Sequence, residues 1–136
     1  MGWNKLVLSH RKLRFAPLWW TCACALTLYV IYGCLIPPDQ VPNFHTNDKV
    51  EHAGAYFAMA FWFGGLLDRR YFPAMIIGLM ALGALIEVAQ GLMGLGRDAD
   101  VWDFVADSVG VFAAVIPAYL GLDSWLVYVE RRLGIS

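Results

Sequence analysis

Four long apolar segments, separated by short polar stretches, constrain this chain more than any other feature of its sequence. They span approximately residues 17–36, 50–67, 73–93 and 103–121. At the rise of an α-helix each segment is about 27–31 Å long, which matches the roughly 30 Å hydrocarbon core of a bilayer. Because the bilayer core offers no water to peptide groups, such segments must form helices. The sequence therefore predicts an all-α, polytopic membrane protein with four transmembrane helices.

The composition agrees with a membrane location. The chain has 136 residues, of which 60% are hydrophobic and 15% charged, whereas soluble domains have about 45–50% and 25%. This length predicts a single four-helix membrane domain covering residues 1–136. The net charge of −1 gives no indication of a nucleic-acid partner.

The basic residues predict an orientation. All but two lie in the N-terminal arm, the second loop and the tail, namely Lys5, Arg11, Lys12, Arg14, Arg69, Arg70, Arg131 and Arg132. The first and third loops contain only Lys49 and Arg97. Since Lys and Arg concentrate in cytoplasmic loops, both termini are expected in the cytoplasm, with the protein in the plasma or inner membrane.

The tail after the fourth apolar segment is too short and too charged to cross a bilayer. Residues 123–133 are predicted to form a short amphipathic helix on the inner membrane surface. Its apolar face, expected toward lipid, consists of Trp125, Leu126, Val129 and Leu133.

Polar side chains converge at the outer end of the predicted bundle. Alternating helix directions bring together the start of the second helix, the end of the third and the start of the fourth. Residues spaced by three or four share a helix face. The predicted ligand-binding set is Asp48, Lys49, His52, Glu87, Gln90, Arg97, Asp103 and Asp107.

Two of these acids are expected to be buried. A charged residue at the centre of a membrane helix costs roughly 2.5–3.5 kcal/mol, so Glu87 and Asp107 should face a protein interior or a watery cavity. Helix capping would explain Asp103 but not these deeper residues. Gly110 and Ala114 form a small-residue face that should let the fourth helix approach a neighbour closely.

The residue types allow two kinds of chemistry. Lys49 and Arg97 could neutralise a phosphate. The imidazole and carboxylates could instead transfer protons or bind a hard cation, with Glu87 and His52 as the catalytic candidates. No established catalytic, phosphate-binding or thiolate-metal motif is present, so no cofactor and no dedicated metal site are predicted.

The ordered motif resembles that of the VanZ-like membrane family. It consists of D-K-x-x-H (Asp48, Lys49, His52), E-x-x-Q (Glu87, Gln90), a glycine-containing turn with Arg97, then Asp103 and Gly110, within about residues 45–118. Asp107 departs from it, since asparagine is expected there. The resemblance implies a small multipass protein acting at the cell envelope, in a family named for a component linked to teicoplanin resistance. It implies no particular reaction.

The leading hypothesis is that the cluster binds an anionic envelope lipid or lipid-linked precursor. The main alternative is an intramembrane enzyme that uses acid/base or metal chemistry on a phosphate-bearing lipid. A transporter would need polar groups on the inner side, which the helices scarcely offer. A purely structural cluster and a homo-oligomer both remain open.

Overall fold

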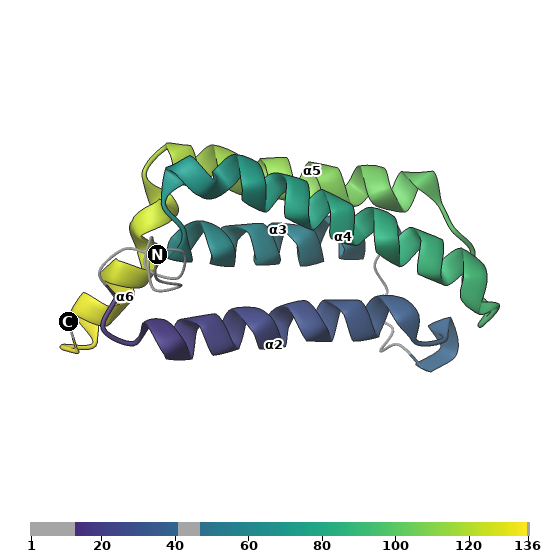
Figure 1. Ribbon diagram of the computed structural model, residues 1–136, viewed down its shortest axis with the longest axis horizontal. Coiled ribbons are helices and arrows are strands. Elements are labelled where there is room, and N and C mark those ends of the chain that lie inside the picture. Colours follow the sequence, from purple (N-terminus) through teal and green to yellow (C-terminus); the bar gives the residue numbers. More distant parts are fainter. Residues whose placement is uncertain (1–12, 41–46, 136) are drawn as a thin grey trace, which may run out of the picture.

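A computed structural model describes residues 13–40 and 47–135, which form a helical bundle. The bounds of its α-helices are α2 Ala16–Leu35, α3 Asp48–Leu66, α4 Phe72–Met93, α5 Val101–Tyr119 and α6 Trp125–Arg132. The long helices α2, α3, α4 and α5 lie alongside one another, and the short α6 closes one end (Figure 1). The all-α prediction is confirmed. Lys5, Arg11 and Lys12 lie outside the described residues, so their part in the orientation stays a prediction.

Three of the described helices are long and apolar enough to cross a membrane. These are α2, α5 and α4 together with the turn before it, Arg69–Met93. The second predicted span, residues 50–67, forms α3, which has 19 residues but carries Asp48 and Glu51 in its first turn. Membrane crossing by α3 therefore remains a prediction, while three candidate spans are established for the described part of the chain.

Polar side chains set where two helices begin. Asn47 is the N-cap of α3, where its side chain accepts a hydrogen bond from the backbone N–H of Lys49. Asp100 caps α5 in the same way, by accepting from the N–H of Trp102. Both caps lie at the same end of the bundle (Figure 1), so the chain enters α3 and α5 side by side.

The pair α3 and α5 is the most closely packed in the bundle. A Cβ on Gly110 would collide with the backbone carbonyl oxygen of Ala53 in α3, and Ala114 is fully buried one turn further along. The predicted small-residue face is thus a packing face. The core beside it contains Tyr56, Met59, Phe72, Leu79, Val111 and Val115.

The opposite end is held by α6, which differs from its predicted position. Leu126 is fully buried in the bundle instead of facing lipid, and Trp125 stacks on Phe61. The cause is Glu130, only 1% exposed, whose carboxylate accepts hydrogen bonds from the Trp19 indole and from two backbone N–H groups before α2. These bonds draw α6 against the start of α2.

Candidate functional site

A buried imidazole lies among acids where α3 meets α5. His52 is 5% exposed, and its Nδ1 lies 2.9 Å from Oδ1 of Asp107. Its Nε2 lies 3.8 Å from Oδ2 of Asp103. The i, i+4 spacing of the two aspartates places them on one face of α5, as the sequence predicts. The approach of α5 to α3 brings that face against His52.

Lys49 is engaged by two acids of the chain itself. Its ammonium group donates to Asp100, the N-cap of α5, and to Asp103 in the first turn. The hydrogen bond from Lys49 lowers the pKa of the Asp100 carboxyl, and the N–H of Trp102 lowers it further. Lys49 therefore ties the start of α3 to the start of α5, whereas the sequence alone would leave it available for a phosphate.

Glu87 has one partner and one unpartnered oxygen. Its Oε2 accepts a hydrogen bond of 2.7 Å from the backbone N–H of Asp100. Its Oε1, like Oδ2 of Asp107, is buried and has no hydrogen-bond partner among the described residues. The residue is only 7% exposed, so the prediction that Glu87 and Asp107 face the interior is confirmed.

Gln90 and Arg97 bind the end of α2. Gln90 Nε2 donates to the carbonyl of Cys34 at 2.7 Å. Arg97 Nε donates to the carbonyl of Ile36 at 2.9 Å, and Nη2 lies 3.4 Å from the carbonyl of Gly33. The last carbonyls of a helix lack partners within it, so these side chains complete the C-terminus of α2.

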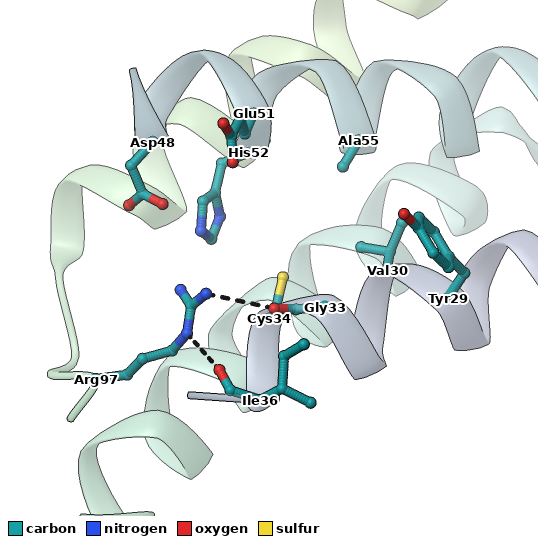
Figure 2. Close-up of a pocket in the computed structure, with 10 residues that line it drawn as sticks. All are labelled: Tyr29, Val30, Gly33, Cys34, Ile36, Asp48, Glu51, His52, Ala55 and Arg97. Carbon is teal, nitrogen blue, oxygen red and sulfur yellow. Dashed lines mark hydrogen bonds between the residues drawn. The ribbon is translucent and has the colours of Figure 1, made fainter. Parts of the chain in front are cut away.

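A cavity of about 290 Å³ lies between α2 and α3 beside this cluster. Figure 2 shows Asp48, His52 and the Arg97 guanidinium around one part of it, with Tyr29, Val30 and Ala55 further along the helices. The remaining lining residues are Gly33, Cys34, Ile36 and Glu51. The pocket is thus polar near Arg97 and mainly apolar beyond it.

All eight predicted residues gather at this end of the bundle, in two connected groups. Arg97 and Asp48 line the pocket, and Gln90 joins α4 to α2. Lys49, His52, Glu87, Asp103 and Asp107 lie between α3, α4 and α5.

The sequence does not reveal several contributors to this cluster. Asp100 has the sequence context of an ordinary loop charge, yet it binds both Lys49 and Glu87. Tyr56 and Gly83 also border the acids, since a Cβ on Gly83 would lie 2.9 Å from Asp107 Oδ2 and 3.4 Å from the Tyr56 hydroxyl. Their spacing is a usable signal, because Tyr56 follows His52 by four residues and Gly83 precedes Glu87 by four.

Comparison of the chain with protein-family models, with curated proteins and with solved structures finds no match. The VanZ-like resemblance thus rests on the motif residues alone and stays a prediction. The described residues establish a helical protein with three candidate membrane spans and a buried acidic cluster.

Proposed function

We propose that this is a multi-pass protein of the plasma or inner membrane that binds a phosphate-bearing envelope lipid or lipid-linked precursor. The observation that carries the proposal is the pocket between α2 and α3, which has a guanidinium group at its polar end and Tyr29, Val30 and Ala55 along its apolar part. An amphipathic ligand matches such a lining, with its headgroup at Arg97 and its chain along the helices.

Arg97 can contact a phosphate without leaving the end of α2. A guanidinium group has five N–H donors, and two hydrogen bonds to backbone carbonyls are described. The remaining donors suit phosphate oxygens. Asp48 and Glu51 line the same pocket, which favours a headgroup that carries hydroxyl or amine groups beside its phosphate.

The predicted orientation would open this pocket toward the outer leaflet. Both termini would then be cytoplasmic, and the ends of α2 and α4 would lie outside. Envelope precursors are exposed on that side, in agreement with what the VanZ-like resemblance implies. A link to glycopeptide resistance belongs to the same resemblance, and glycopeptide susceptibility of a strain lacking the protein would test it.

Native mass spectrometry tests the binding proposal. Purified wild-type protein and Arg97→Ala would be incubated with a panel of phosphate-bearing lipids that differ in headgroup, together with an uncharged diacylglycerol. We expect wild type to retain one headgroup class selectively and Arg97→Ala to lose this selectivity. The matched control is Arg70→Ala, because Arg70 lies in the turn between α3 and α4, at the other end of the bundle.

A second variant separates binding from helix capping. Ala55→Phe fills the apolar part of the pocket and leaves the bonds of Arg97 to α2 in place. The Ala55→Phe variant should also retain less of the lipid, while its melting temperature should stay close to that of wild type. Equal retention by wild type, Arg97→Ala and Ala55→Phe would contradict the proposal.

A second candidate function is an enzyme acting on the bound lipid, and the His52–Asp107 pair favours it. His52 lines the pocket, and its Nδ1 lies 2.9 Å from an Asp107 oxygen. A carboxylate in that position orients an imidazole for general acid/base catalysis. If the protein is an enzyme, wild type should convert the retained lipid to a product of different mass, whereas His52→Gln and Glu87→Gln should bind it unchanged.

A further inference from the structure

Three side chains from three helices converge in the interior beside the pocket. His52 of α3, Glu87 of α4 and Asp107 of α5 each offer a ligand atom, and these atoms lie within 4.8 Å of one another. Each residue is at least nine-tenths buried. Together they are named here the interior triad.

Two carboxylate oxygens of the interior triad lack a hydrogen-bond partner within the described residues. These oxygens are Glu87 Oε1 and Asp107 Oδ2, and both are buried. The Tyr56 hydroxyl near Asp107 is also buried and makes no hydrogen bond within the described residues. Leaving a buried polar group unsatisfied costs about 1–3 kcal/mol, and more for a charged group. Several such oxygens at one place therefore favour a site that binds a ligand.

The charges point to a cation as that ligand. Lys49 already pairs with Asp100 and Asp103, and Arg97 binds backbone carbonyls. Within residues 13–40 and 47–135, Glu87 forms no ion pair. Two carboxylates beside one imidazole thus lack a fixed positive charge, which is costly in an interior unless a cation or protons neutralise them.

We propose that the interior triad binds one divalent transition-metal ion, with Zn²⁺ and Mn²⁺ as the first ions to test. An imidazole with two carboxylates is a donor set that suits these ions. The 2.9 Å between His52 Nδ1 and Asp107 Oδ1 is slightly below the roughly 3.0–3.4 Å between adjacent ligands that each lie about 2.1 Å from one metal in octahedral or tetrahedral geometry, so a small shift would accommodate the ion. His52 Nε2 faces Asp103, a position from which a carboxylate can orient a metal-bound imidazole.

A neighbouring set of residues is the weaker candidate. Asp48, His52 and Asp103 also bring ligand atoms within 4.8 Å. However, Asp103 is already neutralised by Lys49, and Asp48 is exposed. The unpartnered oxygens of Glu87 and Asp107 favour the interior triad.

Metal analysis of the full-length protein tests the proposal. Detergent-purified protein would be stripped with a chelator, incubated with Zn²⁺ or Mn²⁺, desalted and measured for metal per chain. We expect about one ion per chain in wild type. Losing a residue that only supports a metal ligand lowers metal affinity roughly 10–100-fold, so Glu87→Gln and Asp107→Asn, which change the ligands themselves, should lower it by at least that much. Asp98→Asn, which removes an exposed loop carboxylate, is the matched control and should bind as wild type does.

Two measurements on wild type keep the test decisive if a variant fails to fold. Co²⁺ bound by the interior triad should give visible absorption bands and the outer-shell scattering of one imidazole ring in X-ray absorption, and Zn²⁺ should raise the melting temperature. Protein that binds no metal, or that binds it equally after Glu87→Gln and Asp107→Asn, would overturn the proposal and leave protons as the neutralising species. The result is independent of the lipid proposal, because Arg97→Ala should keep the metal.

Discussion

The space beside the unpartnered oxygens exists because residue 83 is a glycine and has no side chain. A Cβ there would lie 2.9 Å from Asp107 Oδ2 and 3.4 Å from the Tyr56 hydroxyl, so a methyl group would fill the space beside the unpartnered oxygens. Gly78, on the same helix, is exposed, and a Cβ added to it would have nothing within 4 Å. The two glycines therefore form a matched pair.

Gly83→Ala should weaken metal binding, because Asp107 must move its carboxylate to make room. Binding of Zn²⁺ should raise the melting temperature of this variant less than that of wild type. Gly78→Ala should keep the full metal-induced rise, and it should gain about 0.5–1 kcal/mol of stability from better helix propensity. Melting curves with chelator and with Zn²⁺ measure both effects. An equal Zn²⁺-induced rise in the two variants would contradict this role of Gly83.

The pairing of each charge could not be predicted from the sequence. Spacing places Asp103 and Asp107 on one face of α5, and the cost of a charge in the membrane correctly predicts that Glu87 is buried. Neither shows that Lys49 binds Asp100 and Asp103, because that depends on how closely α3 and α5 approach. Tyr56 lies in an apolar segment and gives no polar signal of its own, so only its spacing of four residues from His52 connects it with the acids.

At the scale of the helices, Gly110 sets the distance between α3 and α5. Gly110→Ala should destabilise the protein by about 1–3 kcal/mol or more, because the new methyl group meets the backbone of Ala53 and Phe57, which cannot rotate away. Gly54→Ala on α3 is the control, since nothing lies within 4 Å of its Cβ position. Chemical denaturation of both variants measures the difference, and equal stability would show that the two helices can separate without cost.

The bond between α6 and the start of α2 should depend on pH. Burial alone raises the pKa of Glu130, but hydrogen bonds from the backbone N–H groups of Phe15 and Arg14 and from the Trp19 indole lower it below its ordinary value. A lowered folded-state pKa stabilises the protein above the ordinary carboxyl value of about 4.3. This stabilisation is lost as the pH falls from there through the folded-state pKa.

Glu130→Gln should therefore lower the melting temperature at pH 7 and reduce its decrease on acidification toward pH 3. Asp98→Asn, in an exposed loop at the other end, should leave both quantities unchanged. Melting temperatures over this pH range measure the effect. An unchanged acid dependence in Glu130→Gln would show that another group controls it.

The sequence predicts that α2 exists and where it begins and ends, but it does not predict what α2 contributes to the site. The segment predicted at 17–36 forms α2 over Ala16–Leu35, so its existence and bounds follow from hydropathy. Its contribution to the site does not, because α2 offers the backbone carbonyls of Gly33, Cys34 and Ile36 to Arg97 and Gln90. Every residue carries a carbonyl, so only the packing of α2 against α3 and α4 identifies which ones are used.

For the whole molecule, the orientation in the membrane is a prediction that labelling can test. In a variant lacking Cys22, Cys24 and Cys34, new cysteines would be placed at two exposed positions, Asp39 just after α2 and Tyr128 in α6. The end of α2 and α6 lie at opposite ends of the bundle (Figure 1). A membrane-impermeant maleimide added to intact cells should label Asp39→Cys and leave Tyr128→Cys unlabelled until the cells are lysed. The reverse pattern would place the pocket on the cytoplasmic side.

The location of bound lipid tests the central claim most directly. Wild-type protein in bilayers would be irradiated with a phosphate-bearing lipid that carries a photoreactive group in its acyl chain, and the crosslinked residues would be mapped by mass spectrometry. Crosslinks should concentrate at Tyr29, Val30 and Ala55 in the pocket and disappear in Arg97→Ala. Crosslinks spread equally over exposed residues of α4 such as Ile77 and Leu85, and unaffected by Arg97→Ala, would contradict a lipid site between α2 and α3.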